Sequence, residues 1–135
     1  MNLRHATMAD AELLLAWRND PETRRFSRDQ RDIPEAEHYQ WLAKTSVLLA
    51  EQDGMPVGTC RVDSDGWVSL TVAPERRGKG YGRVMLRQLI LGSLGTLFAS
   101  VHAANVASLI VFLKNGFVLD RVQFQWPWFT LVLHR

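Results

Sequence analysis

The stretch that decides the fold reads Val72-Ala73-Pro74-Glu75-Arg76-Arg77-Gly78-Lys79-Gly80-Tyr81-Gly82. A run typical of a β-strand, 67–72, leads into it, and an amphipathic helical run, 81–91, follows it. Its three glycines occupy alternate positions, where the lack of a Cβ allows backbone N–H groups to turn inward. The first turn of the following helix adds unpaired N–H donors and the positive end of the helix dipole. The stretch therefore predicts a cradle for a phosphate-rich ligand.

The spacing of these residues excludes two common phosphate-binding motifs. A P-loop ends in Gly-Lys-Ser/Thr, but Lys79 is followed by Gly80. A dinucleotide fingerprint needs a third glycine where Arg83 stands, and an acidic residue about 20 positions later, where 100–104 has none. The stretch instead resembles the pyrophosphate loop of the GNAT acetyltransferases, which holds the pyrophosphate of acetyl-coenzyme A. A glycine-rich surface turn with solvated arginines is the alternative.

A second motif follows later in the chain and reads Asn105-Val106-Ala107-Ser108-Leu109-Ile110-Val111-Phe112-Leu113-Lys114-Asn115-Gly116-Phe117. It is similar to the GNAT helix and turn Asn-x-x-Ala/Ser-x-x-x-Tyr-x-Lys-x-Gly-Phe. Judged from the residues alone, Asn105 is suited to cap a helix whose apolar positions repeat at helical spacing. Gly116 then ends this helix, and Phe117 opens the next strand. Two motifs in the family's order make a chance match improbable.

The composition agrees with an enzyme domain of this kind. With 135 residues, 47% of them hydrophobic, we expect 1–135 to form a single GNAT domain. A net charge of only +2 argues against a nucleic-acid partner. The one cysteine, Cys60, excludes an internal disulfide and suits a reducing compartment. The N-terminus lacks the apolar core of a signal peptide, and no apolar run approaches 18 residues. We therefore expect a cytoplasmic protein without membrane contact, either a monomer or a homodimer.

The hydrophobic pattern predicts seven strands and four helices. The strands are expected at 3–7, 47–51, 57–63, 67–72, 97–102, 117–124 and 128–134. The helices are expected at 10–17 with Asp10 as its cap, at 34–44, at 81–91 and from Asn105 to Gly116, with a polar connector over 24–32. This order matches the GNAT fold. The resemblance implies an α/β (α+β) fold, with a mixed, mostly antiparallel sheet splayed at the acetyl-CoA site.

The resemblance also implies which residues contact acetyl-CoA. Leu70 and Val72 should lie beside the pantetheine arm and bond to it through their backbone, as an added strand would. The pyrophosphate should be surrounded by Arg77, Gly78, Lys79, Gly80, Tyr81 and Gly82, with the backbone amides as the main donors. Asn105 and Ser108 should contact the thioester side. Arg76 and Lys79 are alternatively solvated and only attract the 3′-phosphate.

The catalytic residues depart from the family pattern. Acetyl transfer needs a neutral amine and favours an acid near the leaving thiolate. The tyrosine that many relatives use as this acid is Phe112 here, and the glutamate that several use as a base is Ser100. The substitute candidates are Ser100 itself and His102, two positions further along the strand, because a histidine side chain ordinarily changes its charge close to neutral pH. A strand-end histidine bonded to the backbone is an equally good interpretation of His102.

Other reactive side chains have simpler explanations. Asp63 and Asp65 precede Gly66 and look like turn formers. Tyr81 should reach the pyrophosphate rather than the thioester. Cys60 is more typical of a small buried residue than of a nucleophile. A metal site is not expected, because the histidines (His5, His38, His102 and His134) are far apart in the sequence.

The N-terminal third suggests the acceptor. Trp17-Arg18-Asn19-Asp20-Pro21-Glu22, with His38 and Trp41 further on, resembles a GNAT branch that includes the ribosomal-protein N-terminal acetyltransferases. The branch also includes enzymes of bacterial sugar pathways. The match is slightly better to the pseudaminic acid type, which acts on a UDP-linked 4-amino sugar. A nucleotide diphosphate could be bound by Arg18, Arg24, Arg25, Arg28 and Arg31, which alternatively form a solvated connector.

Aromatic residues near the acceptor also have two interpretations. His38 and Trp41 lie one helical turn apart and are expected to pack their helix rather than touch substrate. Trp126-Pro127-Trp128 belongs to the final hairpin, where its rings could stack on a sugar or form a core corner.

Three functions remain open from the sequence. The first is an acetyl-CoA-dependent N-acetyltransferase acting on a small amine, with a nucleotide-linked amino sugar as the expected acceptor. The second is acetylation of a protein N-terminus. The third is a non-catalytic acyl-CoA-binding module, which the presence of Phe112 and Ser100 favours.

Overall fold

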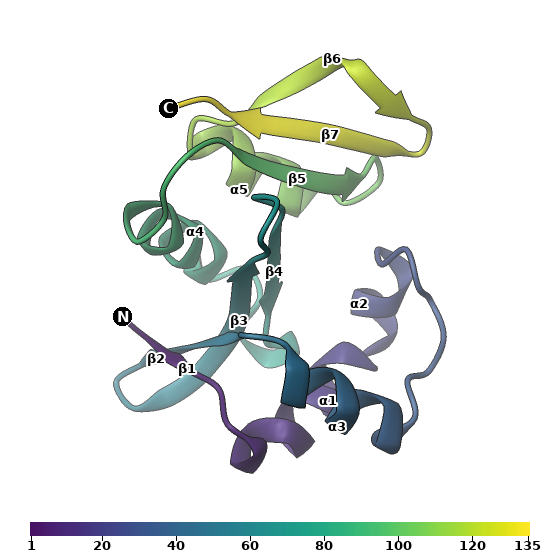
Figure 1. Cartoon of the computed structure of the whole chain (residues 1–135), viewed down its shortest axis with the longest axis vertical. Coiled ribbons are helices and arrows are strands. Elements are labelled where there is room, and N and C mark those ends of the chain that lie inside the picture. Colours follow the sequence, from purple (N-terminus) through teal and green to yellow (C-terminus); the bar gives the residue numbers. More distant parts are fainter.

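A computed structural model of residues 1–135 contains two antiparallel sheets that meet at one point and then diverge (Figure 1). The first sheet has the order β1 (Asn2–His5), β2 (Leu48–Gln52), β3 (Met55–Val62), β4 (Val68–Val72). The second has the order β5 (Leu97–His102), β7 (Trp128–Leu133), β6 (Val118–Gln125). The seven predicted strands are all present, each within a few residues of its expected bounds.

Five α-helices and two 3-10 turns accompany the sheets. They are η1 (Met8–Asp10), α1 (Ala11–Arg18), α2 (Pro21–Arg25), α3 (Glu35–Lys44), η2 (Pro74–Arg76), α4 (Tyr81–Leu91) and α5 (Val106–Lys114). Figure 1 shows α1–α3 gathered at one end of the molecule and β5–β7 at the other, with β3 and β4 between them. None of the helices combines the length and the apolar character that a membrane span requires.

Asp10 holds the N-cap position of α1, as predicted, but its side chain does not cap this helix. Asp10 makes no capping hydrogen bond to α1. Its carboxylate instead accepts a hydrogen bond from the backbone N–H of Thr7 at 2.8 Å and binds the guanidinium of Arg4 at 2.9 Å. Thr7 in turn caps η1, so a capping box starts the segment one short turn earlier than expected.

A short helix that the sequence pattern missed, α2, overlaps the start of the connector predicted over 24–32. Asp20 caps α2 by accepting a hydrogen bond from the Thr23 N–H at 3.2 Å, and Pro21 occupies its first position. A helix of five residues is too short to produce a hydrophobic period. Its capping residues, Asp20 and Pro21, were the only available signal.

The two sheets join at one parallel bridge, Trp67 to Phe98. There the Phe98 N–H donates to the Gly66 carbonyl at 2.8 Å. Gly66 has φ +91°, and a Cβ at this position would lie 2.6 Å from the Thr96 carbonyl oxygen, so the junction requires glycine. Beyond the junction β4 and β5 separate, which opens one edge of β4.

The core lies between the first sheet and α4. Met85 and Leu86 are fully buried on the inner face of α4. They belong to one cluster with residues of β3, β5, α5 and β7, among them Val57, Ala99 and Leu131. This packing fixes the N-terminus of α4 beside the open edge of β4.

Candidate functional site

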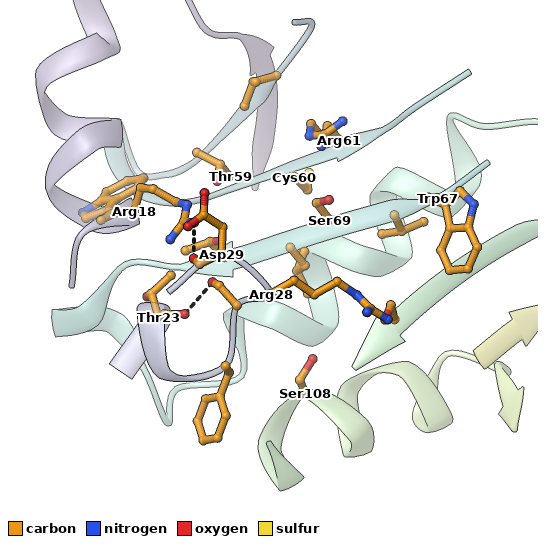
Figure 2. Close-up of a pocket in the computed structure, with 18 of the residues that line it drawn as sticks. Arg18, Thr23, Arg28, Asp29, Thr59, Cys60, Arg61, Trp67, Ser69 and Ser108 are labelled. Atoms are coloured by element: carbon orange, nitrogen blue, oxygen red, sulfur yellow. Dashed lines mark hydrogen bonds between the residues drawn. The ribbon is translucent and has the colours of Figure 1, made fainter. Parts of the chain in front are cut away.

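A cleft of about 630 Å³ lies where the sheets diverge (Figure 2). It is lined by residues of α1, α3 and the 23–33 segment on one side, and by β3 and β4 along its floor. The other side is formed by β5, α5 and β7. The cleft brings together four residues that the sequence singled out: Ser100, His102, Asn105 and Ser108.

The free edge of β4 presents backbone groups to the diverging sheets. At the two ends of the β3–β4 ladder, the Ala73 N–H donates to the Val57 carbonyl at 2.8 Å, and the Asp63 N–H donates to the Trp67 carbonyl at 3.0 Å. In an antiparallel pair, hydrogen-bonded residues alternate with residues whose N–H and C=O point away. The register therefore directs the main-chain groups of Leu70 and Val72 away from β3 and toward the open edge.

The glycine loop, residues 77–82, ends at an uncapped helix. Gly78 and Gly80 have φ +76° and +83°, and nothing lies within 4 Å of the position that a Cβ would occupy on either residue. Gly80 is the N-cap of α4 and provides no capping side chain, so the first N–H groups of α4 are left to a ligand or water. A Cβ at Gly82 would lie 3.3 Å from the Val72 Cγ2, so the glycine lets this helix end approach β4.

Of the charged side chains in the glycine loop, Arg77 forms ion pairs and Lys79 does not. The Arg77 guanidinium binds Asp20 at 2.9 Å and Glu22 at 2.9 Å, and it donates to the Thr23 hydroxyl. Arg77 thus ties the glycine loop to α2, which leaves its backbone rather than its side chain for a phosphate. Lys79 is exposed and forms no ion pair with any carboxylate.

Asn105 caps α5 as predicted. Its Oδ1 accepts a hydrogen bond from the Ser108 N–H at 3.2 Å. This contact holds the first turn of α5 at the edge of the cleft, and Figure 2 shows the Ser108 side chain directed toward it. Gly116 follows α5 with φ +91°, as expected of a residue that ends a helix.

His102 lies at the end of β5 with one ring nitrogen engaged. Its Nδ1 accepts a hydrogen bond from the Ala104 N–H at 3.0 Å, so the neutral ring carries its proton on Nε2. The ring is held between Phe26 and Trp128, at centroid distances of 5.8 and 5.2 Å. The backbone contact considered from the sequence is present, and it leaves Nε2–H as a donor.

Ser100 contacts a residue from the far side of the cleft. The Arg28 Nη2 donates to the Ser100 Oγ at 2.8 Å, and the same guanidinium lies 4.5 Å from the centre of the Trp128 ring. The connector carrying Arg28 therefore reaches β5 and β7 across the cleft opening. A hydroxyl bound in this way is a poor base, since it accepts a hydrogen bond from a cation.

Two residues at the site are part of the core. Phe112 is buried and meets Phe117 edge-on, at a centroid distance of 5.0 Å. Cys60 is buried in β3, and burial raises the pKa of its thiol to about 12. Cys60 is thus the small buried residue that the sequence favoured, because a thiol with this pKa supplies almost no thiolate near neutrality.

Asp63 and His38 also take structural roles. The Asp63 Oδ1 accepts hydrogen bonds from the N–H groups of Asp65 and Trp67, which confirms a turn. His38 is buried, donates from Nε2 to the Ala11 carbonyl at 3.1 Å, and stacks on Trp41. Burial lowers the pKa of His38, which keeps the ring neutral. Its predicted role in packing α3 is confirmed.

The arginines of the N-terminal third divide into two groups. Arg24 donates to the Gln30 carbonyl, and Arg31 pairs with Asp29 and Glu37, so both stabilise the connector. Arg18 and Arg28 line the cleft instead.

Arg61 of β3 is a cleft residue that sequence reasoning missed. Its guanidinium lies 5.7 Å from the centre of the Trp41 ring. Thr59 and Arg61, two positions apart on one strand, both line the cleft. That alternation was visible in the sequence, but nothing there indicated which face of β3 was covered. No group of three or more His, Cys, Asp or Glu residues is arranged to hold a metal ion.

Comparisons with known proteins agree with this geometry. Residues 1–118 match the family model described as an acetyltransferase (GNAT) domain. A ribosomal-protein-alanine N-acetyltransferase from Brucella melitensis is 25% identical, with a TM-score of 0.78 and full coverage of both chains. No curated protein sequence matches the chain significantly.

Two further solved structures share the fold. A putative acetyltransferase from Salmonella typhimurium, solved with its cofactor acetyl-CoA, is 21% identical with a TM-score of 0.76, over 99% of this chain and 93% of that one. A spermidine N-acetyltransferase from Vibrio cholerae, in complex with CoA and spermine, is 14% identical with a TM-score of 0.79, over 98% and 94%. The fold predicted from the two motifs is thereby confirmed.

Proposed function

The chain belongs to the GNAT family of acetyl-CoA-dependent N-acetyltransferases, and we propose that its acceptor is the primary amine of a nucleotide-linked amino sugar, as in the pseudaminic acid type. The observation that supports this proposal is the composition of the cleft lining. The lining combines arginines with aromatic rings, Arg28 with Trp128 and Arg61 with Trp41, and such pairs suit a phosphorylated sugar. We further propose that residues 1–135 form one catalytic domain, which acts in the cytoplasm as a monomer or homodimer.

The residues present fit acetyl-CoA. The uncapped N-terminus of α4 and the open space beside Gly78 and Gly80 suit a pyrophosphate. The outward main-chain groups of Leu70 and Val72 suit a pantetheine arm lying along β4. We assign the contacts to Leu70, Val72, Gly78, Lys79, Gly80, Tyr81, Gly82, Asn105, Ser108 and the backbone of Arg77.

The chemistry assigns a donor role to His102. Acetyl-CoA supplies an acetyl thioester whose C–S bond is replaced by a C–N bond to the amine. The amine must lose a proton, and the departing sulfur must gain one. With Nδ1 occupied by the Ala104 N–H, His102 can donate a hydrogen bond from Nε2–H to the departing thiolate, which Phe112 cannot do. The proton that the sulfur finally takes up balances the one that the amine releases. Holding amine and thioester together in the cleft supplies much of the remaining rate.

We expect replacement of His102 by alanine to lower kcat about tenfold, because it removes the Nε2–H donor that stabilises the departing thiolate. Replacement by glutamine, whose side-chain amide can still donate a hydrogen bond, should keep more of the activity. Comparison of kcat for the two variants separates a donor role from a packing role. An equal loss of activity in both variants would leave His102 as a packing residue.

The acceptor class is tested by thiol release from acetyl-CoA with a panel of amines. The panel contains UDP- and dTDP-linked amino sugars, N-terminal peptides and spermidine. Turnover of one nucleotide sugar, without turnover of peptides, is the expected result. Peptide turnover alone would support the second candidate, a protein N-terminal acetyltransferase, which the relative from Brucella melitensis favours. Binding of acetyl-CoA without turnover of any amine would contradict the proposed acceptor.

A further inference from the structure

Three guanidinium groups line the cleft, and none of them is hydrogen-bonded to a carboxylate. Arg28 donates to the Ser100 hydroxyl and lies over the Trp128 ring. Arg61 makes no hydrogen bond and lies over the Trp41 ring. Arg18 donates one hydrogen bond, from Nη2 to the Asp29 main-chain oxygen at 2.6 Å. Its Nη1 is buried without a partner.

The carboxylates that line the cleft are satisfied by the protein. Asp29 and Glu37 line the cleft, whereas Arg31 does not. Arg31 binds Asp29 at 2.7 Å and Glu37 at 3.0 Å. Hydrogen bonds from Arg31 lower the pKa of Asp29 to about 2. Asp63 accepts two backbone N–H groups of its own turn. The arginines are therefore the charged groups that remain available to a ligand.

We propose that the cleft recognises a phosphate group carried by the acceptor itself, through Arg28 and Arg61, with Arg18 adding positive potential from α1. This inference rests on the proposed acetyltransferase function and extends it to substrate selection. A guanidinium that lies over an aromatic ring keeps N–H groups at its edge for a phosphate oxygen. Arg28, from the 23–33 segment, and Arg61, on the β3 floor of the cleft, each lie over such a ring (Figure 2).

The same charges select against polycationic amines. A polyamine carries several ammonium groups, and a cleft that accepts it needs carboxylates free to pair with them. The lining carboxylates of this cleft are already bound, and the unpaired charges are positive. Spermidine should therefore bind weakly, although a spermidine acetyltransferase shares the fold.

Binding measured by calorimetry on CoA-saturated protein tests the inference independently of turnover. Saturation with CoA fills the glycine loop, so that a phosphate cannot bind there instead. The probes are glucosamine 1-phosphate, glucosamine and spermidine. We expect glucosamine 1-phosphate to bind at least about tenfold more tightly than glucosamine, the effect of one charge-assisted hydrogen bond or more. We expect spermidine to bind no better than glucosamine.

Arg61→Gln should remove most of this difference, with Arg87→Gln as its matched control. Arg87 lies exposed on α4, outside the cleft, and forms no ion pair. The inference is overturned if the phosphate gives no gain in affinity, if spermidine binds best, or if both variants lose the gain equally. If no amine in the thiol-release panel is acetylated, that result counts against the proposed function. The calorimetric affinities still decide whether the cleft has a phosphate site.

Discussion

Gly80→Glu should reduce the affinity for acetyl-CoA more than a hundredfold while the protein remains folded. Gly80 caps α4 in a left-handed conformation, at φ +83°. Its missing side chain faces open space, in the position where a pyrophosphate would meet the N–H groups of the first helical turn. A glutamate at this position places a carboxylate near those donors, where it would compete for them and repel the phosphates.

The matched control for this change is Gly95→Glu. Gly95 also has a positive φ, +76°, and nothing within 4 Å of its Cβ position, but it lies in the loop between α4 and β5. Both substitutions carry a similar backbone cost, about 1–2 kcal/mol for a non-glycine residue in this region. Calorimetry with acetyl-CoA should therefore separate two variants of similar melting temperature. Equal loss of affinity in both would show that backbone strain, and not the phosphate site, explains the effect.

The features predicted well from the sequence are those that depend on neighbouring residues. Helix α4 was predicted at Tyr81–Leu91, where the structure has it, because its apolar period and the preceding glycines are local signals. The Asn105 cap was found for the same reason. The turn between β2 and β3 is local in the same sense, because Asp53 and Gly54 adopt the positive φ that a two-residue hairpin turn requires and that this residue pair favours.

The features that the sequence could not give are contacts between distant segments. Arg28 and Ser100 form a hydrogen bond although they are 72 positions apart in the sequence, and only the fold brings them together. Arg61 meets Trp41 for the same reason. Sequence reasoning treated the arginines of the connector as one group. The structure divides them by partner, since Arg31 is bound to carboxylates and Arg28 to a hydroxyl and a ring.

These contacts connect the divergence of the sheets to the proposed chemistry. The edge of β4 is free because β5 pairs with β7 and meets the first sheet only at the Trp67–Phe98 bridge. The same divergence places His102 and Ser108 on the side of the cleft that Arg28 of the N-terminal third reaches across the opening. The site thus depends on α4 being held tightly against β3 and β4, and one glycine on β3 makes this packing possible.

Gly58→Ala should destabilise the protein by about 3 kcal/mol, at the upper end of the range for an overpacked core. A Cβ at Gly58 would lie 2.4 Å from the Thr71 carbonyl oxygen and 2.8 Å from the Met85 Cε. The Met85 methyl can rotate away, but Thr71 is paired to Thr59 within the β3–β4 ladder and cannot shift without loss of strand pairing. We expect a lower urea midpoint with an unchanged slope.

Gly92→Ala is the matched control, because it adds the same methyl group at a glycine whose φ is also negative, −89°. The nearest atoms to its Cβ position are the Gln88 and Leu89 carbonyl oxygens at 3.6 and 3.8 Å, which are ordinary contacts. Gly92→Ala should therefore change stability by less than about 1 kcal/mol, and a gain is expected from the reduced entropy of the unfolded chain. If the two variants had equal midpoints, the close approach at Gly58 would not control the packing of α4. Acetyl-CoA affinity measured on the folded fraction of Gly58→Ala should also fall, because displacement of β4 or α4 moves the open edge away from the glycine loop.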